Sequence, residues 1–147
     1  MYLRILFVAL SAGVLDMVWW GLTATPGGWL TNALFYTLIA RHSSRLLICA
    51  VGSISLCQIF LMTGSYGMGL TTLALLGALF YYTFKMTDLP GYELIGAVAA
   101  ATVIQWFLLA GCKGGASFGL QQLVGAFISS ATMVYLVPGS QGNRLRK

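Results

Sequence analysis

The sequence predicts an all-α integral membrane protein, folded as a bundle of six membrane-spanning helices. The first observation behind this prediction is composition: of 147 residues, 59% are hydrophobic and 7% are charged, whereas an ordinary soluble domain carries about 25% charged residues. Eight Lys and Arg with three Asp and Glu are too few to cover a soluble fold, and the mean hydropathy of +0.86 indicates a lipid-facing surface. The second observation is that six apolar segments follow one another along the chain.

The six segments differ in length. They are expected at residues 3–22, 29–40, 46–63, 70–84, 94–110 and 120–137. A helix needs about 20 residues to cross about 30 Å of hydrocarbon, so the second and fourth spans are predicted to be short. Glycine clusters between the segments are interpreted as turns on one side of the membrane: Gly27 and Gly28; Gly64, Gly67 and Gly69; and Gly111, Gly114, Gly115 and Gly119.

The first segment is interpreted as a retained span and not as a signal peptide. Only residues 5–8 would form the apolar stretch before a cleavage site at 9–11, whereas secretory signals have about 7 to 15 such residues. The second segment follows a Pro-Gly-Gly turn at 26–28 and ends before Arg41. Because it is too short to cross a bilayer alone, we expect neighbouring helices to shield it.

The basic residues predict that both termini lie in the cytoplasm, since Lys and Arg near span ends stay on that side. With the N-terminus inside, Lys113 alone falls outside. The others fall on the cytoplasmic side: Arg4, Arg41, Arg45, Lys85, Arg144, Arg146 and Lys147. The tryptophans then lie near the outer interface, where indole rings are enriched: Trp19, Trp20, Trp29 and Trp106. We therefore predict one transmembrane domain over residues 1–137 and a basic cytoplasmic tail over residues 138–147.

Asp16 is the one acidic residue within a predicted span. At about 1.5 Å per residue it lies about 18 Å beyond Arg4, in the outer half of the bilayer, where a charge costs at least about 2.5 kcal/mol. Counted in the same way, four amide side chains reach a similar depth: Asn32, Gln58, Gln105 and Gln122. Together these residues predict a polar layer.

Three interpretations of the polar layer are open. It fits a small-molecule or proton site, or a notch that accepts a polar group from a partner helix. It also fits plain interhelical hydrogen bonds, worth about 0.6 kcal/mol each, which need no ligand. No basic residue lies at this depth to pair with an anion, so transport of anionic substrates is disfavoured.

No catalytic, cofactor or metal site is predicted. His42 is the only histidine, whereas a metal site or a serine hydrolase needs further partners. Asp88 and Glu93 lie in a solvated loop that gives no reason for acid–base chemistry. Cys49 and Cys57 are about 12 Å apart along a helix, beyond the reach of a disulfide. The positive charge is scattered along loops, which excludes a nucleic-acid binder.

Small residues recur at the four-residue spacing that lets helices approach closely. The pairs include Gly13 with Ala9, Gly96 with Ala100, and Gly125 with Ser129. They predict close packing inside the bundle or against another subunit, and we expect Gly125 and Ser129 to pack inside the bundle.

Three stretches, in this order, carry a family resemblance. They are a Pro-led segment with a Tyr and a closing Arg (26–41), a glycine- and polar-rich helix with a small-residue turn (52–70), and a Leu-rich helix ending in aromatics (73–82). This order resembles the MreD family, small bacterial inner-membrane proteins of the rod-shape (elongasome) machinery. Where the family would place an Asp in its third segment, this chain has Gln58.

The resemblance implies a non-enzymatic subunit of the bacterial inner membrane. Such a subunit associates with MreC and, through it, with the cell-wall polymerase, transpeptidase and actin-like filament. The implied fold is similar to the substrate-binding component of energy-coupling-factor vitamin transporters. The residues themselves also favour an assembly subunit that packs with partner membrane proteins. The alternative is a small transporter or ligand-binding membrane subunit that uses the polar layer around Asp16 and Gln58.

Overall fold

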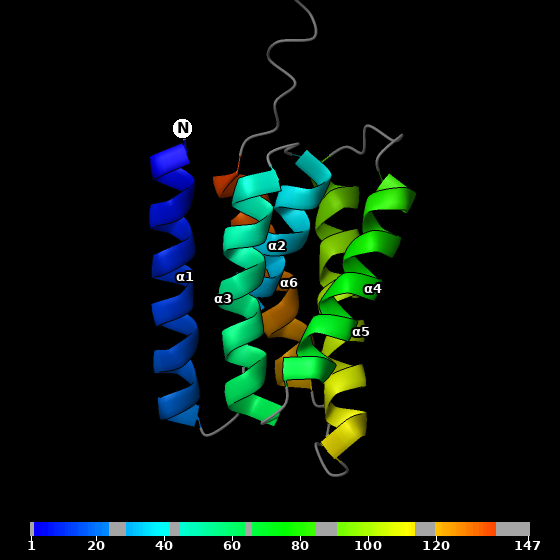
Figure 1. Cartoon of the computed structure of the whole chain (residues 1–147). Helices are drawn as coiled ribbons and strands as arrows, with labels where there is room; N and C mark the ends of the chain where they lie inside the picture. The colour runs from blue at the N-terminus through cyan, green and yellow to red at the C-terminus, as the bar shows by residue number, and fades with distance from the viewer. Residues whose placement is uncertain are drawn as a thin grey trace, which may run out of the picture.

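The computed structural model describes residues 2–23, 29–41, 45–63, 66–84, 91–113 and 120–137, and these residues form six helices and no strand. The helices are α1 (Tyr2–Thr23), α2 (Trp29–Arg41), α3 (Arg45–Thr63), α4 (Tyr66–Phe84), α5 (Gly91–Lys113) and α6 (Leu120–Leu136). The prediction of an all-helical chain with six helices is confirmed. Successive helices run in opposite directions, so α1 begins and α6 ends at the same end of the bundle (Figure 1). The predicted tail over 138–147 lies outside the described residues.

The fourth helix is longer than predicted. α4 has 19 residues, as α3 does, and its apolar stretch over Gly69–Thr83 has the short length expected of the fourth span. Gly67 and Gly69, which the sequence pattern assigns to a turn, lie within the first turns of α4. A Cβ at Gly69 would lie 2.9 Å from Ile59 Cγ2 of α3, so this glycine permits close packing of two helices. α5 likewise continues through Gly111, because one glycine costs a helix only about 1 kcal/mol.

Length and hydropathy identify one described helix as able to cross a membrane, over Gly91–Leu108 in α5. Three further helices are apolar but shorter over the part of the chain that the structure describes: Arg45–Leu61, Gly69–Thr83 and Leu123–Leu136. Length and hydropathy together therefore identify a single candidate span among the described residues.

α2 is the central helix and packs against every other helix of the bundle. Six consecutive residues, 33–38, are all buried, and at 3.6 residues per turn they cover the full circumference of the helix. A helix buried on all sides must be enclosed by its neighbours. This enclosure explains why α2 can be short: its 13 residues extend over about 20 Å and lie between longer helices.

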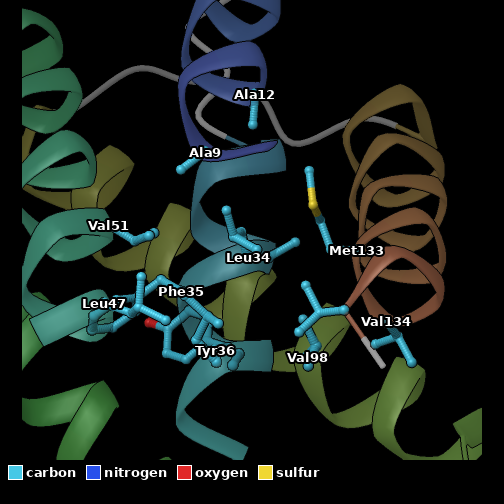
Figure 2. Close-up of a cluster of buried hydrophobic side chains, with 14 of the residues drawn as sticks. Ala9, Ala12, Leu34, Phe35, Tyr36, Leu47, Val51, Val98, Met133 and Val134 are labelled. Carbon is cyan, nitrogen blue, oxygen red and sulfur yellow. The ribbon is translucent and has the colours of Figure 1, made fainter. Parts of the chain in front are cut away.

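Small side chains on α1 allow it to approach α2 closely. Ala9 and Ala12 are fully buried, and they face Leu34 of α2, with Met133 of α6 beyond it (Figure 2). An alanine has no side-chain atom past Cβ, so the two helix backbones can come near each other. The exposed side chains of α1 are mostly large and apolar: Leu3, Leu6, Phe7, Leu10, Val14, Leu15, Met17, Val18, Trp19 and Leu22. α1 is thus packed on one narrow face and open on the other.

Two glycines make room for Phe35 on the other side of α2. A Cβ at Gly52 of α3 would lie 3.2 Å from the ring, and a Cβ at Gly77 of α4 would lie 3.4 Å from it. Tyr36 packs edge-on against Phe35, with ring centroids 5.4 Å apart, and tilted against Phe80, with centroids 5.3 Å apart. Aromatic pairs in these geometries contribute beyond the area that they bury, so this cluster holds α2, α3 and α4 together.

The small residues predicted to pack helices occupy different environments. Gly13 is half-buried, and a Cβ there would lie 3.5 Å from a side-chain methyl of α3, an ordinary contact. An added Cβ at Gly96 or Gly125 would meet no atom within 4 Å. Ala100 is exposed and Ser129 is buried. Gly96 and Gly125 therefore leave open space beside α5 and α6.

Gly69→Ala is expected to destabilise the protein, because the new Cβ would lie 2.9 Å from Ile59 Cγ2 and 3.0 Å from Leu56 Cδ1. The branched Ile59 side chain is stiff near its backbone, and overpacking of this kind costs about 1–3 kcal/mol. Gly96→Ala is the matched control, since the same change falls in open space and favours the helix by up to about 1 kcal/mol. The thermal midpoint in detergent should fall for the first variant only. Equal midpoints would contradict the close approach of α3 and α4.

Candidate functional site

Asp16 is a buried acid, 5% exposed, and its carboxylate lies at the start of α2. Its Oδ1 accepts a hydrogen bond from the backbone N–H of Leu30 at 3.2 Å. Its Oδ2 accepts from the backbone N–H of Thr31 at 3.0 Å and from the Thr31 hydroxyl at 2.8 Å. Three donors of α2 thus converge on one carboxylate of α1.

The Asp16 carboxylate supplies hydrogen-bond acceptors for N–H groups in the first turn of α2. The first N–H groups of a helix have no partner within it, and a buried N–H left unpaired costs about 1–3 kcal/mol. The acceptor usually comes from the residue just before the helix, whereas Asp16 lies 14 residues before Leu30, on a neighbouring helix. The negative charge also faces the positive end of the α2 dipole. Asp16 therefore caps α2 and ties it to α1.

Gln58 connects this site to α3. Its Nε2 donates to Thr31 Oγ1 at 3.2 Å, and that hydroxyl in turn donates to Asp16 Oδ2. Asp16, Thr31 and Gln58 are called the Asp16 cluster below. Gln58 Oε1 is buried with no hydrogen-bond partner in the described part of the chain, and the same holds for Ser55 Oγ, one turn earlier on α3. The Asp16 cluster therefore joins three helices and keeps one acceptor unused.

A second polar group, the Gln105 cluster, joins α2 to α5. The Tyr36 hydroxyl donates to Gln105 Oε1 at 2.7 Å, and Gln105 Nε2 donates to Asn32 Oδ1 at 3.2 Å. Both ends of the Gln105 amide are therefore engaged, which fixes its orientation. Beside this cluster the rings of Trp29 and Trp106 stack, with centroids 6.3 Å apart and planes at 18°, so aromatic packing reinforces the same pair of helices.

Four of the five residues predicted to form a polar layer lie in these two clusters: Asp16 and Gln58, and Asn32 and Gln105. The fifth, Gln122, belongs to α6, and its side chain lies outside the described residues. Sequence reasoning missed Thr31 and Tyr36. The signal for Tyr36 is general: a Tyr within an apolar segment needs a hydrogen-bond partner for its hydroxyl. Thr31 carries no such signal, because threonine commonly bonds to its own helix.

Arg41 contacts α6 from the other end of α2. Its Nη1 donates to the backbone carbonyls of Val134 at 2.8 Å and Val137 at 2.6 Å. The last carbonyls of a helix lack partners within it, and a positive charge is favourable at the negative end of a helix dipole. α2 therefore receives a carboxylate at its start and, through Arg41, holds the end of α6.

The remaining chemically active side chains that the structure describes are not gathered at either cluster. His42 and Asp88 lie outside the described residues. Glu93 is exposed in the first turn of α5, and Cys49 and Cys57 are exposed on α3. No group of three or more His, Cys, Asp or Glu that could hold a metal ion occurs among the described residues.

Comparison with known proteins finds no relative. No family model, curated protein or solved structure matches the chain. Its function is therefore argued from the two polar clusters, the apolar outer surface and the charge pattern.

Asp16→Ala is expected to lower the free energy of unfolding by at least about 3 kcal/mol, because hydrogen bonds to a charged group contribute about 1.5–3 kcal/mol each. Asp16→Asn keeps one carbonyl oxygen for the α2 N–H groups and should lose about half as much. Glu93→Ala, at an exposed acid, is the control and should stay within about 0.5 kcal/mol. Denaturant unfolding in mixed micelles measures all three, and an Asp16→Ala variant as stable as the control would refute the capping role.

Arg41→Met should destabilise the protein by about 1–3 kcal/mol, because two carbonyls at the end of α6 lose a charged donor. Arg41→Lys should be intermediate, since a single ammonium lacks the guanidinium geometry. Arg45→Met, at an exposed position, is the matched control, with an expected effect within about 0.5 kcal/mol. The comparison uses thermal midpoints in one detergent, and equal losses at positions 41 and 45 would exclude a specific contact with α6.

Proposed function

We propose that the protein is a non-catalytic, multi-span membrane subunit that packs with partner membrane proteins. The observation that carries the proposal is the internal pairing of the polar layer. Asp16 and Gln58 both bond to Thr31, and Gln105 bonds to Asn32 and Tyr36. Buried polar groups paired in this way fix the arrangement of helices. They support a rigid body that partners can recognise.

The outer surface supports placement in a lipid bilayer. Large apolar side chains are exposed on several helices, including Leu75, Leu79, Ile104, Phe107, Leu108, Phe127, Ile128 and Tyr135. Exposed apolar surface on this scale marks contact with lipid or with other proteins. The exposed Arg4 and Arg45 lie at the ends of α1 and α3 that share one side of the bundle. This fits a cytoplasmic side under the positive-inside rule.

The resemblance to the MreD family implies a cellular location and a partner complex. On that basis we place the protein in the bacterial inner membrane, as a component of the cell-shape complex with an MreC-like partner. The open space beside Gly96 and Gly125 fits this role, because a partner helix can approach closely where no side chain intervenes.

One observation favours the alternative of a small transporter or ligand-binding subunit. Gln58 Oε1 and Ser55 Oγ are buried without partners in the described part of the chain, and unpaired buried polar groups are uncommon in folded proteins. Gln58→Leu discriminates between the two functions: it should abolish transport if the cluster binds substrate, and leave recovery of partners intact if the protein is an assembly subunit.

Purification of the tagged protein from its native host in a mild detergent is expected to recover membrane or periplasmic partners in stoichiometric amounts. Cell-wall elongation proteins among them would support the MreD-like role. Gly125→Leu fills open space beside α6 and should reduce partner recovery without lowering the thermal midpoint. A monodisperse protein recovered alone would overturn the proposed function.

A further inference from the structure

The Asp16 carboxylate is buried away from any positive side chain described on the helices that form its site. At about 1.5 Å per residue, Arg4 lies about 18 Å away along α1, Arg41 lies about 15 Å beyond Thr31, and Arg45 lies about 20 Å before Gln58. The other described titratable groups on these helices point elsewhere: Tyr36 bonds to Gln105, and Cys49 and Cys57 are exposed. The compensation for this charge therefore comes from the three hydrogen bonds of Leu30 and Thr31, at the positive end of the α2 dipole.

The hydrogen bonds of the Asp16 cluster run in one direction. The Thr31 hydroxyl has a single hydrogen, which it donates to Asp16 Oδ2 at 2.8 Å. Thr31 Oγ1 must then accept from Gln58, so the amide presents its Nε2 at 3.2 Å. That orientation leaves Gln58 Oε1 buried and without a donor in the described residues. An ionised Asp16 therefore leaves one buried acceptor unsatisfied at the far end of the chain.

We propose that the Asp16 cluster is a reversible binding site for one proton, and that proton binding reverses this chain of hydrogen bonds. A proton from solvent adds to Asp16 Oδ2, which then donates to Thr31 Oγ1. The Thr31 hydroxyl turns and donates to Gln58 Oε1, after the amide rotates by about 180° about its terminal bond. Oδ1 keeps its bond from the Leu30 N–H. No covalent bond forms or breaks apart from the new O–H, and no electrons are transferred.

The two states of the cluster leave different groups unsatisfied. The ionised state uses the favourable field at the start of α2 but leaves Gln58 Oε1 unpaired. The protonated state removes a buried charge, which is costly in an apolar surrounding, and gives that oxygen a donor. The rotated amide in turn gives up the bond from its Nε2 to Thr31 Oγ1. One proton thus changes the bonds among α1, α2 and α3 while the helices keep their places.

This inference is independent of the proposed assembly function. It makes the contact between α1 and the rest of the bundle responsive to pH, whichever partners the protein has. A failure of partner recovery would leave the proton site standing, and a failure of proton binding would leave the assembly role standing.

Infrared spectroscopy of the full chain in lipid nanodiscs tests the site. The sequence has three Asp and Glu residues, so the variant Asp88→Asn with Glu93→Gln leaves Asp16 as the only side-chain carboxyl. As the pH is lowered within the folded range, we expect the carboxylate bands to convert to one protonated-carboxyl band. The band should disappear when Asp16→Asn is added, which separates it from the C-terminal carboxyl.

Two variants test the hydrogen-bond chain itself. Thr31→Val removes the acceptor of the new O–H and should shift both the frequency of the band and the pH at which it forms. Thr31→Ser keeps the hydroxyl and should restore both, which guards against a fold defect in the Val variant. The proposal is overturned if no Asp16-dependent band forms before unfolding, or if Thr31→Val leaves the band unchanged. The measurement is made with choline as the buffer cation and repeated with Na⁺ at the same pH. If Na⁺ abolishes the band, the proposal is also overturned, since the site would then hold a metal cation.

Discussion

A helix that begins inside an apolar bundle needs acceptors for its first N–H groups, and here those acceptors come from Asp16 of a neighbouring helix. The carboxylate bonds the N–H groups of Leu30 and Thr31 as well as the Thr31 hydroxyl. Without it, α2 would start with buried, unpaired donors, each at a cost of about 1–3 kcal/mol. Because α2 packs against every other helix, the position of its first turn sets the arrangement of the whole bundle.

The other polar contacts of α2 also join it to neighbouring helices. The Gln105 cluster joins it to α5, and Arg41 bonds the terminal carbonyls of α6. These contacts join helices, while the exposed side chains of the bundle are largely apolar. Such a body suits a subunit whose partners recognise its shape within a membrane. The Asp16 cluster adds a feature that packing alone does not require, namely a buried acceptor that a single proton would satisfy.

Much of this arrangement follows from periodicity and depth along the chain. Counting residues from the span ends places Asp16 and Gln58 at one level, and the structure joins both to Thr31. The length of α4 could not be found in this way, because a glycine in a turn and a glycine in a close contact look alike. Gly69 is explained only by Ile59 across the helix interface. The bond from Arg41 to α6 likewise depends on which helices are neighbours, and a single sequence does not specify that.

The most direct test of the central claim is site-resolved backbone amide exchange at the start of α2, measured by nuclear magnetic resonance in the unmodified protein. If Asp16 caps the helix, the amides of Leu30 and Thr31 should exchange as slowly as those at residues 35–38, in the middle of α2. First-turn amides without an acceptor exchange much faster than the helix interior. Rapid exchange at these two amides in an otherwise protected helix would contradict the account.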